Sequence, residues 1–185
     1  MTAQPYDRHY QTRDLFGDPL PALIAFFEQL QPGRRVWDMG AGQGRDTLPL
    51  ARMGHQVRAI DSSRTGLDCI AKAAAAARLA NITTLCADVH SLKVAPECQV
   101  LLFDAMFHFY KRDRASEMAL LERVSNQLSD RGILACAVPA NQTTAANLAL
   151  LHQSAWASWG RLTDVESRHE HTGTLYRFLA LEKVP

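Results

Sequence analysis

Three aspartates stand where short apolar runs of the sequence end, and their carboxylates are well placed to bind a ligand. Asp38 lies inside the run 36–39, Asp61 ends the next run, and Asp88 directly follows the third. Carboxylates accept hydrogen bonds from ammonium, hydroxyl and amine groups. For each aspartate alone the alternative is a helix cap or a solvated loop carboxylate, and for Asp88 alone the two interpretations have equal weight. Three of them at successive strand ends favour one shared ligand site.

A glycine-rich turn follows Asp38. Gly40, Gly42 and Gly44 form a Gly-x-Gly-x-Gly pattern, and Arg45 comes next, just before a predicted helix. Glycines permit a sharp turn and let a ligand lie against bare main chain, while a helix start offers free N–H groups. The dinucleotide fingerprint is Gly-x-Gly-x-x-Gly, so the third glycine here comes one residue early. Because a carboxylate at Asp38 would repel a pyrophosphate but accept from an ammonium group, the turn favours a ligand with an amino acid moiety.

The other two aspartates favour a nucleoside. Asp61 follows Asp38 by 23 residues, close to the spacing of about 20 residues at which an acid grips a ribose diol. Asp88 could accept from the exocyclic amine of adenine, with the Val89 N–H beside it. The three carboxylates together predict a ligand held by its amine, its sugar and its base.

The elements that must position these residues alternate between helix and strand. Apolar residues at helical spacing and turn residues between them predict helices over 20–30, 46–53, 63–81, 113–128 and 145–159, and strands over 35–39, 56–60, 82–87, 99–106, 133–138, 161–169 and 174–182. We expect Ser63 and Asp113 to cap two of the helices, and Gly54 to end another.

This alternation predicts an α/β fold with a doubly wound, mostly parallel sheet of seven strands and a C-terminal antiparallel hairpin. Ligands of such sheets bind beyond the carboxyl ends of the strands. The three aspartates and the glycine turn all fall at that edge.

Composition bounds the class of protein. The chain has 185 residues, a formal net charge of +1 and 47% hydrophobic residues, which predicts one domain, with residues 1–32 as an N-terminal lid and helix and residues 33–185 as the core. The near-zero charge gives no general attraction to nucleic acid or to an anionic membrane. The N-terminus lacks the apolar block of a signal peptide, and four scattered cysteines fit reduced, buried thiols, so we expect a cytoplasmic protein.

Taken together, these motifs resemble those of the class I S-adenosylmethionine-dependent methyltransferases. The resemblance is carried by the pattern Asp38-x-Gly40-x-Gly42-x-Gly44, by Asp61, by Ala87-Asp88 and by the apolar run 101–104, and it covers about residues 34–138. The run 43–57 looks most like the small tellurite-resistance and thiopurine-type enzymes. The N-terminal Tyr6-Asp7-x-x-Tyr10 is similar to the lid segment of such enzymes, and the closing hairpin is similar to their last two strands.

The resemblance implies S-adenosylmethionine as cofactor and gives roles to residues of the first turn. Asp38 and Gly40 would lie near the methionyl amine and carboxylate. Gly42 and Gly44 would shape the loop, and Arg45 would belong to the same cofactor site.

The remaining cofactor contacts that the resemblance implies come from the next three strands. Asp61 would hold the ribose hydroxyls, and Ser62 would neighbour the adenine. Asp88 and Val89 would hold the edge of the base. At the end of the fourth strand, Asp104 and Met106 would line the far side of the cofactor.

The fourth strand departs from one branch of this family. It continues as Asp104-Ala105-Met106-Phe107-His108-Phe109-Tyr110 and lacks the Asn/Asp-Pro-Pro-aromatic motif of enzymes that methylate amino groups of nucleic acids and proteins. We therefore expect a small-molecule acceptor, such as a thiol or a chalcogen oxyanion, and no nucleic-acid or membrane partner. The protein would be a monomer or a homodimer.

Methyl transfer from a sulfonium is an in-line displacement, which requires alignment and exclusion of water more than it requires a metal. No Cys/His cluster has zinc spacing, so no metal is expected. His108 is the candidate base and Tyr110 its backup or an acceptor-orienting group; the alternative for His108 is a loop histidine stacked among aromatic residues. Tyr6, Tyr10 and Phe16 could close over the cofactor as a lid.

Two alternative functions would use some of the same residues. A non-catalytic S-adenosylmethionine-binding protein needs the three aspartates but no acceptor pocket. A nicotinamide-dependent oxidoreductase would tolerate Asp38→Ala, but the glycine spacing does not fit it.

Overall fold

The computed structural model describes Tyr10 and residues 16–185. The strands in this part of the chain are β1 (Arg35–Met39), β2 (Gln56–Asp61), β3 (Ile82–Cys86), β4 (Val100–Asp104), β5 (Ile133–Pro139), β6 (Gly160–Arg168) and β7 (Leu175–Glu182). The helices are α1 (Pro21–Gln29), α2 (Thr47–Arg52), α3 (Arg64–Ala76), α4 (Arg114–Gln127) and α5 (Gln142–Gln153).

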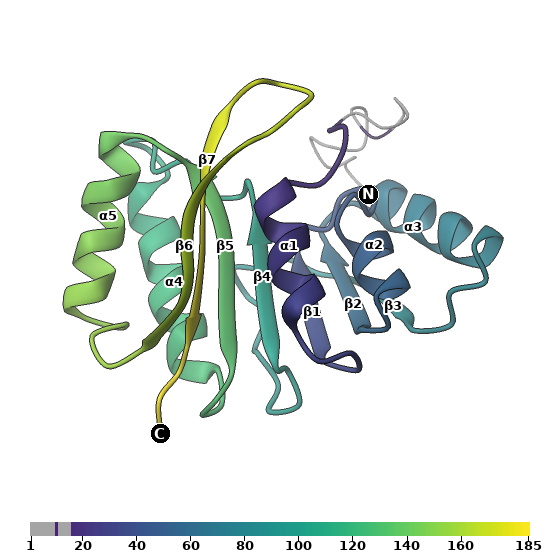
Figure 1. Cartoon of the computed structure of the whole chain (residues 1–185), viewed down its shortest axis with the longest axis horizontal. Helices are drawn as coiled ribbons and strands as arrows, with labels where there is room; N and C mark the ends of the chain where they lie inside the picture. The colour runs from purple at the N-terminus through teal and green to yellow at the C-terminus, as the bar shows by residue number, and fades with distance from the viewer. Residues whose placement is uncertain (1–9, 11–15) are drawn as a thin grey trace.

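The strands form one sheet in the order β3-β2-β1-β4-β5-β7-β6 (Figure 1). Strands β3, β2, β1, β4 and β5 are parallel to their neighbours, whereas β7 runs antiparallel to both β5 and β6. The predicted seven-stranded α/β sheet with a C-terminal antiparallel hairpin is confirmed. The chain order reverses next to β1, so the carboxyl ends of β1 and β4 flank the switch point of the sheet.

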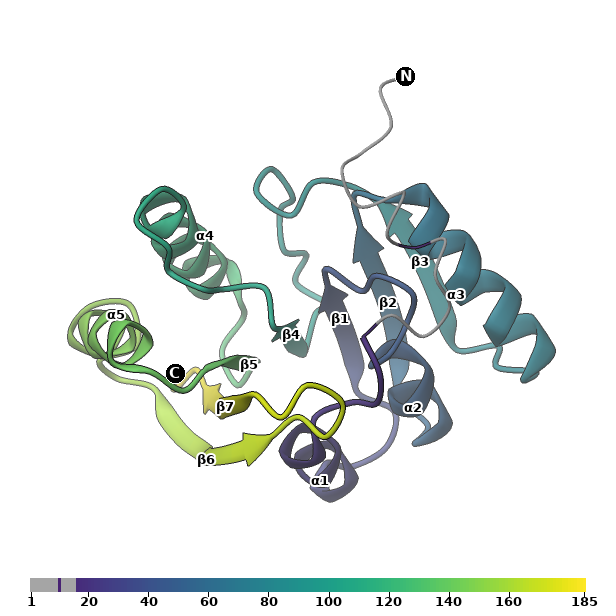
Figure 2. The ribbon, with the colours of Figure 1, turned by 90° about the horizontal axis from the view of Figure 1, so that it is seen from above.

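Helices cover both faces of the sheet, with α1, α2 and α3 on one face and α4 and α5 on the other (Figure 2). Side chains alternate between these faces along each strand. On β1, Val36 packs in the core under α1 and α2, whereas Trp37 packs in the core on the α4 side. Strand β4 is buried on both faces from Val100 to Phe103, as expected for a central strand.

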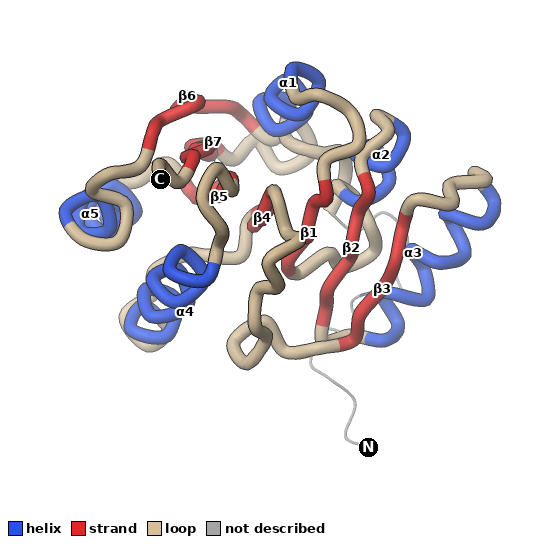
Figure 3. Tube along the Cα trace, turned by 90° about the horizontal axis from the view of Figure 1, so that it is seen from below, coloured by secondary structure: helices blue, strands red, loops and turns tan. Residues whose placement is uncertain are grey.

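The connection from β3 to β4 crosses the sheet without a helix, and Figure 3 shows it as a long loop beside the red strands. Val89, Val94 and Cys98 anchor it in the core on the α4 side. Arg123 of α4 donates to the carbonyl oxygens of Val89 and Leu92, at 2.9 and 2.5 Å. This loop therefore packs on the same face of the sheet as α4 and α5.

Capping decides where two helices begin. The predicted cap Ser63 is confirmed, because its hydroxyl oxygen accepts from the Gly66 N–H at 3.2 Å. The predicted cap Asp113 is wrong: its backbone is already helical and it makes no cap hydrogen bond, because its carboxylate pairs with Arg112 at 3.0 Å.

The predicted bounds of the last helix are wrong as well. Helix α5 begins at Gln142, because the Asn141 side chain accepts from the Thr144 N–H at 2.9 Å, and it ends at Gln153. Trp156 lies in the turns beyond that end, where its indole donates to Ser125 Oγ at 2.7 Å. Its burial comes from this contact with α4 rather than from helical periodicity.

Two further expectations concern environment. Cys98 and Cys136 are buried, as predicted, but Cys86 is exposed on the edge strand β3.

Of the helices in the described part of the chain, none combines the length and the apolar character needed to cross a membrane.

Candidate active site

The glycine turn after β1 is held in place by Asp61 at the end of β2. Gly40, Gly42 and Gly44 all have positive φ angles (77, 53 and 89°), a region that side-chain-bearing residues rarely adopt. Asp61 Oδ2 accepts from the Gly42 N–H at 2.9 Å, and its Oδ1 accepts from the Ser63 N–H at 2.7 Å. One carboxylate thus ties the turn to the start of α3.

Asp38 lies beneath this turn and is almost completely buried. Its Oδ2 accepts from the Thr47 hydroxyl of α2 at 2.5 Å. Burial, reinforced by the neighbouring carboxylate of Asp46, raises the pKa of Asp38 to about 7, although the Thr47 hydrogen bond and Arg45 act in the opposite direction. Asp38 therefore changes protonation near neutral pH.

Arg45 joins two further carboxylates into one network. Its guanidinium pairs with Asp46 at 2.9 Å and also with Asp104 at the end of β4. Burial and the charge of Asp46 raise the pKa of Asp104 well above its ordinary value. Burial alone would lower the pKa of Arg45, but the carboxylates of Asp46 and Asp104 outweigh it and raise the pKa.

Arg45 therefore pairs with Asp46 and Asp104, and its charge also acts on the buried Asp38. We call Asp38, Arg45, Asp46 and Asp104 the acidic corner. Sequence reasoning missed Asp46 and the role of Thr47, and the available signal was their place directly after the glycine turn at the start of a helix.

The third predicted acid stands apart from this corner. Asp88 is exposed, and its Oδ1 accepts from the His90 N–H at 2.9 Å within its own loop. Val89 beside it is buried in the core, and Ser62 is exposed at the start of α3. Asp88 follows β3, so it lies at the same edge of the sheet as Asp61, which ends β2. Its side-chain hydrogen bond with the His90 N–H is that of a loop carboxylate that caps a turn.

Two side chains cover the bare main chain of the glycine turn. A Cβ atom built on Gly40 would lie 2.6 Å from the Met106 sulfur, and one built on Gly42 would lie 3.1 Å from the Tyr10 hydroxyl oxygen. The ring of Phe16 meets Tyr10 edge-on, with 6.2 Å between ring centroids. Of the three predicted lid residues, Tyr10 lies against the turn, Phe16 contacts Tyr10, and Tyr6 lies outside the described residues.

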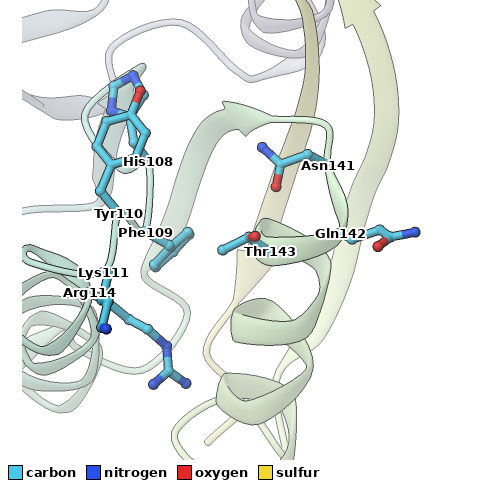
Figure 4. A pocket seen from close by; sticks show the side chains of 8 residues that line it. All are labelled: His108, Phe109, Tyr110, Lys111, Arg114, Asn141, Gln142 and Thr143. Atoms are coloured by element: carbon cyan, nitrogen blue, oxygen red, sulfur yellow. The ribbon is translucent and has the colours of Figure 1, made fainter.

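The loop after β4 presents aromatic residues alternately to the core and to the surface. Phe107 and Phe109 are buried, whereas the rings of His108 and Tyr110 face outward and stack on each other at 5.3 Å and 13° (Figure 4). Phe109 has a positive φ of 53°. Glu117 of α4 stabilises this shape by accepting from the His108 and Phe109 N–H groups at 3.3 and 2.7 Å.

Glu117 is a residue that sequence reasoning missed, since a buried glutamate cannot be told from a solvated one by its place on a helix. It holds the two candidate catalytic residues on the same side of the loop.

An open hollow of about 690 Å³ lies beside His108 and Tyr110. It runs between the loop after β4 and the start of α5 (Figure 4), and its lining residues are His108, Phe109, Tyr110, Lys111, Arg114, Asn141, Gln142 and Thr143. Burial, together with the charge of Asp104, raises the pKa of Tyr176 on β7. The predicted catalytic pair belongs to the loop that follows Asp104 of the acidic corner.

Comparisons with known proteins agree with this arrangement. The chain matches the family model described as Methyltransferase domain over residues 36–132, which is more than half of its length. The cypemycin N-terminal methyltransferase from Streptomyces sp is 29% identical over 127 residues, which cover 66% of this chain and 50% of that protein. The chain therefore spans half the length of that curated relative.

Solved structures share the fold at low sequence identity. TehB from Haemophilus influenzae has a TM-score of 0.70 at 15% identity, covering 96% of this chain and 65% of that one. The N-methyltransferase NodS from Bradyrhizobium japonicum, in complex with S-adenosyl-L-homocysteine, has a TM-score of 0.74 at 11% identity, covering 98% of both chains. An rRNA methylase from Streptococcus thermophilus has a TM-score of 0.65 at 16% identity, covering 100% of this chain and 99% of that one.

The family match runs from β1 through α4, ending just before β5, and includes the glycine turn, Asp61 and the acidic corner. The chain belongs to the methyltransferase domain family, in the class I S-adenosylmethionine-dependent group that its motifs predict.

Proposed function

We propose that this protein transfers a methyl group from S-adenosylmethionine to a small-molecule acceptor by in-line displacement, with the acceptor held near His108 and Tyr110. The observation that carries the proposal is that Asp104 of the acidic corner ends β4, and that the loop directly after it carries His108 and Tyr110, which line the hollow. A site for a cationic methyl donor and a site for a nucleophile then meet at the carboxyl ends of β1 and β4.

The residues present fit the cofactor. Burial raises the pKa of Asp38 and Asp104, and the ammonium and sulfonium groups of the cofactor would favour the ionised form of both carboxyls. The glycines of the turn carry no side chain of their own and adopt positive φ angles, so a cofactor could approach their main chain closely. When bound, the cofactor supplies an activated methyl group whose leaving group is a neutral thioether.

Particular residues would hold each part of the cofactor. Asp38, as part of the acidic corner, would lie near the methionyl amine. Asp61 keeps further lone pairs beyond its two backbone contacts and would accept from the ribose hydroxyls. Asp88 and Val89 would line the adenine, and Met106 would contact the cofactor from the side of Gly40.

The protein's own contribution to the reaction is alignment. His108 and Tyr110, stacked and fixed by Glu117, would orient the acceptor toward the methyl group, and the His108 imidazole would take a proton from acceptors that must lose one. Tyr10 and Phe16 would exclude water above the turn. An acceptor that is already anionic, such as a thiolate or a chalcogen oxyanion, would need no base.

The restriction to small molecules rests on sequence. The fourth strand lacks the Asn/Asp-Pro-Pro-aromatic motif, and the net charge of +1 gives no general attraction to nucleic acid. Because the rRNA methylase of Streptococcus thermophilus shares the fold, the restriction to small molecules stays a prediction, as does the choice between a monomer and a homodimer.

Calorimetric titration with S-adenosylhomocysteine tests the cofactor site. We expect the wild-type protein to bind it, and Asp61→Ala to weaken the binding by about tenfold or more, because loss of a charge-assisted hydrogen bond costs about 1.5–3 kcal/mol and frees the glycine turn. Asp164→Ala is the control, since it removes a carboxylate that pairs with Arg177 of the C-terminal hairpin at 2.6 Å, and no ion pair among the described residues joins it to the glycine turn. Equal affinity of the Asp61→Ala and wild-type proteins would remove Asp61 from the site.

Catalysis is tested by incubating the protein with S-adenosylmethionine and a panel of thiols, amines, phenols, halides and oxidised selenium and tellurium species, with mass detection of methylated products. One or a few preferred acceptors support an enzyme. Tight cofactor binding with only slow, indiscriminate transfer would instead identify a non-catalytic S-adenosylmethionine-binding protein.

A further inference from the structure

The charged side chains that line the hollow beside His108 are all positive. They are Lys111 and Arg114, together with the titratable His108, and the described lining contains no carboxylate. The ion pairs among the described residues do not include Lys111 or Arg114. An open cavity with two unneutralised cations attracts anions.

The arginine is oriented by a buried partner. Arg114 Nε donates to Asn147 Oδ1 at 2.6 Å, and Asn147 is only 2% exposed. The Asn147 amide in turn donates to the Thr143 carbonyl oxygen at 2.8 Å. This contact uses Nε and leaves the two terminal nitrogens of the guanidinium for another acceptor, in the planar arrangement that binds a carboxylate or a phosphate.

The nearest acids do not cancel this charge from within the cavity. Glu117 lies beneath the loop, where its two oxygens accept from the His108 and Phe109 N–H groups. Asp113 pairs with Arg112, which does not line the hollow. The basic lining therefore contrasts with the acidic corner at the end of β4.

Figure 4 shows how the lining is divided. The side chains of Lys111 and Arg114 extend to one side of the loop after β4, and the rings of His108 and Tyr110 extend to the other. Asn141 and Thr143 point toward this loop from the start of α5, whereas Gln142 points away.

Resting on the proposed function, we propose that the methyl acceptor carries an anionic group, a carboxylate or a phosphate, which Arg114 and Lys111 bind. The nucleophilic end of the acceptor then lies toward His108 and Tyr110. Because Lys111 and Arg114 attract the anionic group to their end of the hollow, they orient the acceptor with its nucleophile toward the methyl donor.

Matched acceptor pairs test this inference. The probes are phenol, 4-hydroxybenzoate and 4-hydroxyphenyl phosphate, and thiophenol with 4-mercaptobenzoate, each incubated with S-adenosylmethionine and followed by mass detection of product. We expect at least a tenfold higher kcat/KM for the charged member of a pair. The ratio between the carboxylate and the phosphate probe distinguishes the two anions.

Arg114→Gln should reduce this preference for the charged member at least tenfold, mainly through KM, and Lys111→Gln should reduce it several-fold. Arg112→Gln is the matched control, because it removes a neighbouring arginine outside the hollow and should keep the preference. Lys111 is exposed, so its variant reports on the site even if Arg114→Gln fails to fold.

A binding measurement covers the case in which no probe is methylated. 4-Hydroxybenzoate and inorganic phosphate are titrated into protein saturated with S-adenosylhomocysteine, and we expect binding that Arg114→Gln weakens at least tenfold. Equal use of charged and neutral acceptors, equal behaviour of Arg114→Gln and Arg112→Gln, or no binding of either anion would overturn the inference. Failure of the wild-type protein to bind S-adenosylhomocysteine would instead overturn the proposed function.

Discussion

At the scale of single residues, charge is divided between two neighbouring parts of one sheet edge. Asp46 and Asp104 pair with Arg45, whose charge also acts on Asp38, on one side, whereas Lys111 and Arg114 line the hollow on the other. Residues of the same type also differ in role. Asp61 accepts a hydrogen bond from the glycine turn, whereas Asp88 accepts one from its own loop. The carboxylates predicted to share one ligand site therefore make different contacts.

His108 is the residue whose loss should separate catalysis from folding. We expect His108→Ala to lower kcat by about 10²-fold if the imidazole acts as a base and to change S-adenosylhomocysteine affinity less than twofold, because a positioned base contributes about 10²–10⁴-fold. Tyr110→Phe keeps the ring that stacks on His108 and removes only the hydroxyl. Steady-state kinetics and calorimetry measure both quantities, and equal losses of turnover and cofactor affinity would show that His108 is structural.

At the scale of elements, the site depends on how closely α3 approaches the glycine turn. A Cβ atom on Gly66 would lie 2.4 Å from the Gly42 carbonyl oxygen and 3.2 Å from the Tyr10 ring. Gly66 therefore lets the first turn of α3, the glycine turn and Tyr10 pack together. Main-chain atoms cannot move aside as the end of a side chain can.

Gly66→Ala should lower the free energy of unfolding by about 1–3 kcal/mol, since overpacking against main chain exceeds the gain of about 1 kcal/mol in helix propensity. It should also weaken S-adenosylhomocysteine binding. Gly160→Ala is the control, because its Cβ would meet only ordinary contacts at 3.8 Å. Urea unfolding and calorimetry measure both effects, and a Gly66→Ala protein as stable as wild type would contradict the close approach.

At the scale of the whole molecule, the acidic corner links stability to pH. The pKa of Asp38 is about 7 in the folded protein against an ordinary value of 3.8. Between these values the folded chain holds a proton that the unfolded chain has released, so the contribution of Asp38 to stability falls as pH rises through this interval. Asp164 acts in the opposite direction, because its hydrogen bond to Arg177 lowers its pKa and its contribution is lost as pH falls.

The difference between wild type and Asp38→Asn isolates the Asp38 contribution. We expect the stability of wild type relative to Asp38→Asn to decrease from pH 4 to pH 7, by up to about 1.4 kcal/mol per pH unit. Asparagine keeps an acceptor for the Thr47 hydroxyl but cannot ionise. Urea unfolding at several pH values provides the measurement, and a difference that stays constant with pH would show that Asp38 does not titrate in this range.

Other statements about the whole molecule stay predictions. They are the division into a lid and helix over residues 1–32 and a core over residues 33–185, the cytoplasmic location and the absence of a nucleic-acid partner. For the first of these, Leu23, Phe26 and Phe27 of α1 pack in the same core as Val36 and Phe178, so α1 forms part of the folded body.

The order of elements and the site edge were predictable from sequence because they rest on local patterns. Apolar periodicity, glycine turns and the Ser63 cap act over a few residues, and they predicted the seven-stranded sheet and the glycine turn. The bounds of α5 were not predictable from periodicity alone, because Trp156 is buried by a contact with Ser125 on another helix.

The sequence by itself therefore determined the fold, the family and the sheet edge at which we expect ligands to bind. Only the tertiary structure decided that Arg45 joins Asp46 to Asp104, that Glu117 fixes the outward pair His108 and Tyr110, and that Arg114 is held by Asn147 beside them. The physical reason is range: charge pairs, buried hydrogen bonds and pKa shifts depend on which side chains the folded sheet brings together, and residues far apart in the chain supply them.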